Sequence, residues 1–131
     1  MLSKIGALSR QTGVHVETIR YYERIRLLPK PARSEGGHRF YTLVHEKRLS
    51  FIRRCRALDF SLDEIRFLLQ AAEADKPSCG EVEKFSEKHL SRLRDKIKEF
   101  KAMEKTLKAL LSQCQANKGP SCPLIDVLYE N

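Results

Sequence analysis

The chain has 131 residues, of which 41% are hydrophobic, and a formal net charge of +8 at pH 7. This length supports one small domain plus an appendage, and we expect neither a signal peptide nor a membrane span, so the predicted location is cytoplasmic and the thiols should stay reduced. The positive charge is uneven: residues 1–66 hold 14 Lys and Arg against 7 Asp and Glu, whereas residues 67–131 hold 11 against 10. A basic first half predicts a part that binds a polyanion.

Two short helices joined by a tight turn are predicted near the N-terminus. The first covers Ile5–Gln11 and is stopped by Gly13; the second runs from about Val16 to Leu27 and is stopped by Pro29. Such a pair is typical of a helix-turn-helix. The second helix mixes Arg and Tyr with few aliphatic residues, and Arg can fork onto guanine or phosphate while Tyr hydroxyls reach phosphates and the rings pack on sugars. We expect Ile19 to face the core of this part.

The next segment predicts a β-hairpin, or wing. Gly36-Gly37 is a tight-turn signal between extended residues. Arg39 and Tyr41 share one strand face by the period of two, so both are expected to contact the DNA backbone. The role of His38, which precedes Arg39, is left open.

Two more helices are predicted after the wing. The third covers about Leu43–Leu58 and carries Arg53, Arg54 and Arg56, while Cys55 within it is interpreted as a buried core residue. The fourth begins at a capping box in which Ser61 is the N-cap and Glu64 the third helical residue. Residues 74–78 are expected to form a hinge.

A long helix follows, because residues 81–113 contain neither Pro nor Gly. Its apolar positions recur at steps of three and four and form a narrow seam made of Leu90, Leu93, Ile97, Phe100, Met103, Leu107, Leu110 and Cys114. No other segment of the same chain is large enough to bury this seam. We therefore predict a homodimer in which two such helices pair antiparallel.

Three cysteines predict a soft-metal site shared between two subunits. Cys79 begins the long helix, while Cys114 and Cys122 flank a Gly/Pro loop at its end. At ~1.5 Å per residue, Cys79 and Cys114 of one chain would lie roughly 52 Å apart. Antiparallel pairing instead brings Cys79 of one protomer to the two loop cysteines of its partner. The alternatives are buried structural thiols, a disulfide between Cys114 and Cys122, and a thiol redox sensor.

The residues of the first half resemble the MerR family of transcription regulators. The likeness is carried by Ile5-Gly6, Val16-Glu17-Thr18-Ile19-Arg20-Tyr21-Tyr22-Glu23, Arg33-Ser34-Glu35-Gly36, Arg39-Phe40-Tyr41 and Phe60-Ser61-Leu62-Asp63-Glu64-Ile65. It implies a dimeric winged helix-turn-helix protein that stays on double-stranded promoter DNA, represses without its effector and, with it, distorts the promoter so that RNA polymerase can engage. The implied DNA contacts are Thr18, Arg20, Tyr21, Tyr22, Arg33, Arg39, Tyr41 and Arg54.

The cysteine set resembles that of the mercury(II) sensors within this family. Soft thiolates favour soft ions, so Cys79, Cys114 and Cys122 predict Hg(II) as effector, with Pb(II), Cd(II) and, less favoured, Zn(II) as alternatives. The seven residues between Cys114 and Cys122 match the copper(I)-responsive members in length, although those members usually lack a Cys at position 79. His89 is expected to be an interface residue and not a ligand.

The predicted architecture is mainly α, in three parts. Residues 1–75 form the winged helix-turn-helix domain, 76–113 the antiparallel coiled-coil dimerisation helix, and 114–131 the metal-binding loop and a short C-terminal helix, read over Pro123–Leu128. No phosphate loop, paired carboxylates in a cleft or nucleophile with a nearby base is recognisable, so we expect a regulator and not an enzyme, without an organic cofactor and without a membrane partner. Nucleoid association is expected from the DNA-binding function.

Overall fold

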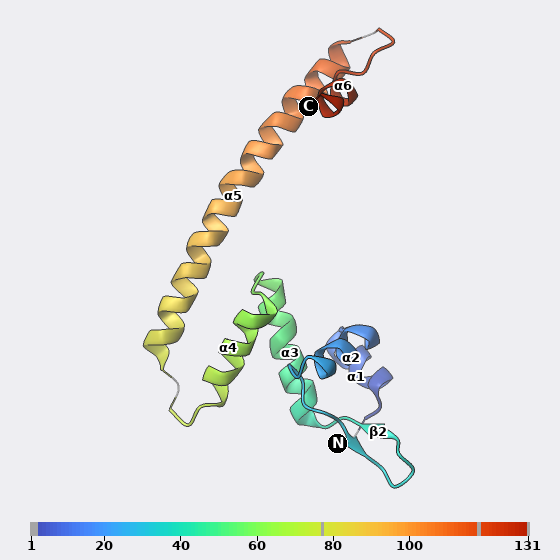
Figure 1. Cartoon of the computed structure of the whole chain (residues 1–131), viewed down its shortest axis with the longest axis vertical. Coiled ribbons are helices and arrows are strands. Elements are labelled where there is room, and N and C mark those ends of the chain that lie inside the picture. The colour runs from blue at the N-terminus through green and yellow to red at the C-terminus, as the bar shows by residue number, and fades with distance from the viewer. Residues whose placement is uncertain (1–2, 77, 118, 131) are drawn as a thin grey trace. The chain divides into compact units, whose positions relative to one another are not determined.

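The computed structural model describes residues 3–76, 78–117 and 119–130. Its elements are α1 (Ile5–Thr12), α2 (Val16–Arg24), β1 (Ala32–Arg33), β2 (Arg39–Phe40), α3 (Leu43–Ala57), α4 (Leu62–Glu73), α5 (Cys79–Ala116) and α6 (Pro123–Tyr129), as Figure 1 shows. The predicted mainly helical architecture is confirmed. Two compact units divide the chain, Met1–Val82 and Glu83–Asn131. The predicted domain limits after residues 75 and 113 stay predictions.

The turn between α1 and α2 forms as the sequence predicts. Gly13 ends α1 with a left-handed φ of 74°, and its N–H donates to the Ser9 carbonyl, a conformation that glycine adopts without steric cost. The Arg53 guanidinium also packs against Gly13, since a Cβ added there would lie 3.1 Å from its Cζ. Gly13 therefore provides both the turn and the space for a side chain of α3.

Helix α2 ends at Arg24, three residues before the predicted end. Leu27 and Leu28 are 0% and 1% exposed, and both backbone N–H groups donate to the Tyr22 carbonyl. In a continuing helix, the side chains of Leu27 and Leu28 would point in different directions. The observed turn after α2 instead buries both leucines. The chain makes the turn with Arg26 at a φ of 60°. The predicted end at Leu27 was therefore wrong, but Ile19 is fully buried as expected.

The wing is a short antiparallel hairpin. Its strands pair Ala32 with Phe40 and Arg33 with Arg39. The turn closes with a hydrogen bond from the Ser34 N–H to the His38 carbonyl, and Gly37 has a φ of 81°. The predicted hairpin turn at Gly36-Gly37 is confirmed.

Helices α3 and α4 complete the core of the first unit. Leu49 and Ile52 of α3 and Ile65 and Leu69 of α4 are buried, and Cys55 is buried with them as predicted. The predicted capping box is present, because the Glu64 N–H donates to Ser61 Oγ and the Ser61 N–H to Glu64 Oε1. Of the predicted hinge, Pro77 lies outside the described residues.

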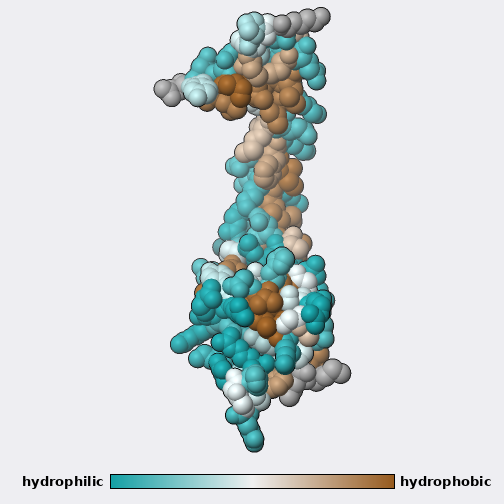
Figure 2. All heavy atoms as spheres, turned by 90° about the vertical axis from the view of Figure 1, so that its right-hand side faces the viewer, coloured by the Kyte–Doolittle hydropathy of each residue, from teal (hydrophilic) through white to brown (hydrophobic). Residues whose placement is uncertain are grey.

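Helix α5 is a single helix of 38 residues. Its predicted seam is exposed in the chain: Ile97, Phe100, Met103 and Leu107 are between 50% and 66% exposed, and Figure 2 shows hydrophobic residues along the helix. Among the described residues, no helix combines the length and low polarity that crossing a bilayer requires. The apolar stripe on an otherwise polar helix fits a protein partner.

Helix α6 confirms the predicted short C-terminal helix and lies beside the end of α5 (Figure 1). Leu124 and Leu128 of α6 face Met103, Leu107 and Leu110 of α5 across an open apolar groove of about 680 Å³. The second unit thus leaves apolar surface uncovered on both of its helices.

Candidate nucleic-acid interface and metal centre

Helix α2 presents two of the predicted DNA contacts to solvent. Tyr21 is 42% exposed, and the Arg20 side chain is 46% exposed and pairs with Glu17 at 3.0 Å. The Arg24 guanidinium lies over the Tyr21 ring, 5.7 Å from its centroid. Thr18 is half-buried. These side chains form a polar and aromatic surface of the kind that contacts phosphates and base edges.

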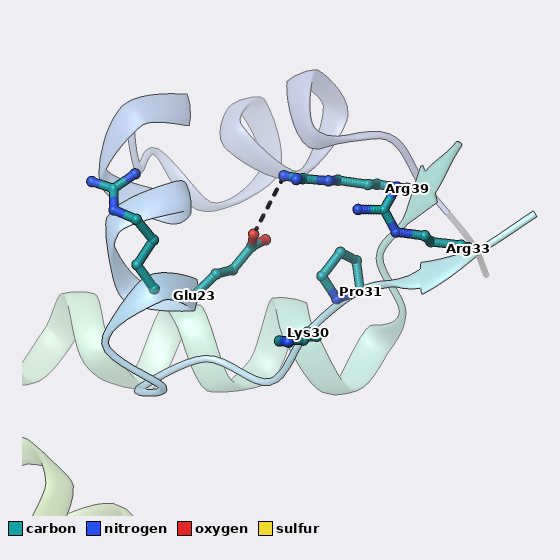
Figure 3. Close-up of a pocket in the computed structure, with 6 residues that line it drawn as sticks. Glu23, Lys30, Pro31, Arg33 and Arg39 are labelled. Atoms are coloured by element: carbon teal, nitrogen blue, oxygen red, sulfur yellow. Dashed lines mark ion pairs between the residues drawn. The ribbon is translucent and has the colours of Figure 1, made fainter. Parts of the chain in front are cut away.

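The wing adds Arg33 and Arg39, both exposed. Arg33 Nη1 donates to the Gly37 carbonyl at 2.9 Å, and Arg39 Nη1 lies 3.7 Å from Glu23 Oε2. Between α2 and the wing lies an open pocket of about 360 Å³ (Figure 3), lined by Glu23, Arg24, Lys30, Pro31, Arg33 and Arg39. Four cations against one carboxylate make this pocket suitable for an anion.

Two of the predicted DNA contacts are buried, and their expected roles need correction. Tyr41 is 0% exposed, and its hydroxyl donates to Glu23 Oε1 at 2.5 Å. The Tyr41 side chain therefore lacks the solvent exposure that the predicted contact with the DNA backbone requires. Tyr22 is 8% exposed, so its ring packs inside the protein and lacks the exposed face that a sugar contact requires.

Helix α3 contributes the last predicted contact, Arg54, which is exposed together with Arg53 and Arg56. Arg56 Nη1 donates to the Phe60 carbonyl at 2.7 Å, so this arginine has a structural partner. Four lining residues of the basic pocket were not among the predicted site residues, namely Glu23, Arg24, Lys30 and Pro31. Glu23 lies within the predicted second helix and Lys30 shortly after it, but only the folded chain brings them to the wing.

The structure brings two of the three predicted metal ligands together. Cys114 Sγ lies 3.8 Å from Cys122 Sγ, where α5 ends and α6 begins. All four cysteines are free thiols, and a disulfide requires a sulfur separation of about 2.05 Å. The alternative of a disulfide between these two residues is therefore not what the structure contains.

Backbone groups of α6 favour the thiolate of Cys122. The Ile125 N–H is the main cause of a lowered pKa for the Cys122 thiol, and the Cys114 thiol and the Leu124 N–H act in the same direction. Desolvation and the Asp126 carboxylate oppose them. A thiolate is the form of cysteine that binds metal. The lowered pKa therefore favours the metal-binding form of Cys122.

Cys79, the third predicted ligand, is exposed and is the first residue of α5, whereas Cys114 lies near the other end of this helix. Within the described part of the chain, no cluster of three or more His, Cys, Asp or Glu side chains could hold a metal ion. His89 is buried in α5 and belongs to no such cluster. One protomer thus supplies a pair of thiols and not a complete three-sulfur site.

Comparison with known protein families identifies the family of this chain. Residues 3–72 match the model of the MerR HTH family regulatory proteins, and residues 46–110 match the model described as MerR, DNA binding. The chain belongs to the MerR family. The predicted resemblance is thereby confirmed, and the chain is a DNA-binding transcription regulator of this family.

Individual MerR-family relatives are similar over nearly the whole chain. The mercuric resistance operon regulatory protein of Bacillus cereus is 39% identical over 131 residues, covering 99% of both chains. A transcription regulator of Ralstonia metallidurans, solved in complex with lead(II), is 44% identical with a TM-score of 0.75 over 96% of this chain and 98% of that one. The MerR regulator of Bacillus megaterium, solved with mercury(II), is 34% identical with a TM-score of 0.68 over 98% of this chain and 100% of that one.

Proposed function

We propose that this MerR-family regulator binds promoter DNA as a homodimer and responds to a soft divalent metal ion. Hg(II) is the first candidate, and Pb(II), Cd(II) and Zn(II) are the alternatives. The relatives named for mercuric resistance, and those solved with mercury(II) and lead(II), support a metal effector. The observation that carries the proposal is the pair of free thiols of Cys114 and Cys122, 3.8 Å apart.

The spacing of these thiols suits one metal ion with a bent coordination. Two sulfurs 3.8 Å apart, each at a metal distance of about 2.3 Å, would subtend an angle of about 110° at the ion. A linear two-sulfur ion would need a separation of about 4.6 Å at the same bond length. The bent arrangement leaves one side open for a further thiolate, which favours a divalent ion over a linear monovalent one.

We propose that Cys79 of the partner protomer supplies this third thiolate. The exposed apolar seam of α5 supports pairing of two such helices, and in the antiparallel pairing proposed here the start of one α5 would lie beside the end of the other. Two-fold symmetry then gives two identical sites per dimer. When bound, the ion would link the two protomers through their thiolates.

This metal link between the protomers would couple metal binding to the DNA-binding part. Helix α6 and the loop before it would close over the site, while Cys79 follows directly on the segment joining α4 to α5. A pull on Cys79 would therefore be passed to the DNA-binding part of that protomer. In this proposal the protein represses without metal, and with metal it distorts the promoter so that RNA polymerase can engage.

Subunit exchange tests the proposal. A Cys79→Ser protein and a Cys114→Ser protein are each expected to bind Hg(II) weakly under reducing conditions in competition with a small-molecule thiol. After the two are mixed and allowed to exchange subunits, heterodimers should regain one intact site, because one protomer supplies Cys79 and the other supplies both Cys114 and Cys122. Failure of the mixture to recover tight binding would overturn the shared site.

Metal identity is tested on the same protein. Competitive titration of the reduced wild-type dimer with Hg(II), Pb(II), Cd(II) and Zn(II) should rank Hg(II) first. Promoter binding and transcription with purified RNA polymerase, measured with and without each ion, would connect that ranking to regulation. A protein that binds these ions but leaves transcription unchanged would contradict the regulatory part of the proposal.

A further inference from the structure

A carboxylate lies between α2 and the wing, in the middle of a surface expected to bind a polyanion. The Glu23 side chain is only 10% exposed. Its Oε1 accepts the Tyr41 hydroxyl at 2.5 Å, and its Oε2 lies 3.7 Å from Arg39 Nη1. Figure 3 shows Arg39 reaching from the wing towards Glu23. One side chain of α2 thus contacts the residues at both ends of the segment 39–41.

Neighbouring residues fix both the backbone and the ring of Tyr41. Its backbone exchanges two hydrogen bonds with Ser3, of 2.8 and 2.7 Å. Its ring packs edge-on against His45 of α3, with 5.3 Å between centroids, and it has no exposed surface. Because Tyr41 cannot move without disturbing these contacts, its hydroxyl is a fixed point to which Glu23 is anchored.

The position of Glu23 carries two energetic costs. Burying a carboxylate is costly without hydrogen-bonded or charged partners, and a negative charge beside bound DNA repels phosphates. Glu23 nevertheless lines the basic pocket together with Arg24, Lys30, Arg33 and Arg39. The contacts of Glu23 with Tyr41 and Arg39 offset its burial and direct Arg39 along one wall of that pocket.

We propose that Glu23 is a positioning residue that fixes the wing on α2 and holds Arg39 at the basic pocket, where the pocket receives one phosphate of the DNA backbone. This inference rests on the proposed binding of DNA. Glu23 itself makes no contact with DNA in the proposal. It acts through Arg39, and its anchor is Tyr41.

A matched pair of variants separates positioning from simple charge. Glu23→Gln and Glu35→Gln each remove one negative charge, the second from an exposed residue in the turn of the wing. Charge alone would make both variants bind DNA as tightly as wild type or more tightly. The proposal expects Glu35→Gln to do so, and expects Glu23→Gln to bind about tenfold more weakly. The probe is a duplex selected by the wild-type protein from a random-sequence pool.

A double-variant cycle tests whether Glu23 acts through Arg39. Glu23→Gln should lose most of its effect on affinity in an Arg39→Ala background, because the group that it positions is then absent. Both single variants should also lower the slope of log affinity against log salt by about one phosphate contact. Loss of stability alone would not change that slope. Thermal unfolding of each variant measures its stability separately.

The outcomes distinguish this inference from the proposed function. If the wild-type protein selects no duplex, the proposed binding of DNA fails. If it selects a duplex but Glu23→Gln binds as tightly as Glu35→Gln, or if the effects of Glu23→Gln and Arg39→Ala simply add, the positioning role is wrong while DNA binding stands. Should Glu23→Gln fold poorly, Tyr41→Phe removes the anchor of Glu23 without changing any charge and should show the same lowered slope.

Discussion

Cys114 Sγ lies 3.8 Å from Cys122 Sγ, across the junction at which α5 ends and α6 begins. The two free thiols belong to one protomer and are close enough to share one ion. In the proposed dimer, the third thiolate comes from the opposite end of the partner's α5.

Replacing Cys122 with Ser should weaken Hg(II) binding by roughly 100-fold or more, because loss of a direct ligand costs at least as much as loss of a group that only orients one. Competition with a small-molecule thiol would measure the change. Cys55→Ser is the control: Cys55 is buried in the first unit, so its replacement should leave metal affinity unchanged. Equal losses in the two variants would argue against the assigned site.

The thiols should differ in their reactivity with pH. The Ile125 N–H, more than any other group, lowers the pKa of Cys122, so its thiolate should form at a pH below 9.0, the ordinary value. Desolvation raises the pKa of Cys55, whose thiolate should form above 9.0. Alkylation by iodoacetamide, followed by mass spectrometry of each peptide from pH 6 to 10, would show the two midpoints. A Cys122 midpoint at or above 9.0 would contradict the contacts described at the start of α6.

Tyr41→Phe should destabilise the protein by about 1–3 kcal/mol, because it leaves the buried Glu23 carboxylate without its hydroxyl partner. Burial, followed by the hydrogen bond to Glu23, raises the pKa of Tyr41 from 10.0 to about 12. A raised pKa in the folded state means that the contribution to stability is complete below pH 10 and is lost as the pH rises towards 12. The stability difference between wild type and Tyr41→Phe, measured by urea unfolding, should therefore shrink over that range. A constant difference would show that Tyr41 does not titrate as described.

Arg20→Ala and Arg39→Ala should affect DNA binding in different ways. If Arg20 reads a base, its loss should cost about 1–3 kcal/mol and relax the sequence preference at one position. Arg39→Ala should weaken binding to all sequences and lower the salt dependence by about one contact. Lys108→Ala, in the exposed part of α5, is a control for charge outside the DNA-binding unit. Unchanged binding in both arginine variants would show that neither α2 nor the wing contacts DNA as proposed.

Phe100→Asp should convert the dimer to monomer at micromolar concentration. Phe100 is 66% exposed in the chain and lies in the middle of the apolar seam, so a charge there would be buried without a partner in a paired α5. Lys101→Ala changes the next residue, which lies off the seam, and should remain dimeric. Sedimentation velocity distinguishes the two states. A dimeric Phe100→Asp protein would place the dimer interface elsewhere.

Much of the fold could be predicted from short-range features of the sequence. Gly13 and Gly37 mark turns because the backbone there needs conformations that glycine tolerates, and Ser61 with Glu64 caps α4 through bonds three residues apart. The apolar period of α5 likewise depends only on helix geometry. These features act between neighbours in the chain, so the pattern of residue types is sufficient to identify them.

Other features depended on the tertiary structure. A period of two places Arg39 and Tyr41 on one strand face, but only the packing of Ser3 and His45 around Tyr41 buries that residue completely. The turn that buries Leu27 and Leu28 shortened α2 for a similar reason, since the core and not helix propensity decided where those side chains lie.

For the candidate sites, too, some features follow from residue types and others from the tertiary structure. The sequence by itself determined which side chains are available, namely three candidate thiolates and a helix that carries Arg and Tyr, because donor chemistry belongs to residue types. The distance between Cys114 and Cys122, and the link from Glu23 to Tyr41 across 18 residues, were decided only by the tertiary structure. Such pairs form because burial and loop closure bring distant segments together, and residue spacing along the chain does not encode that approach.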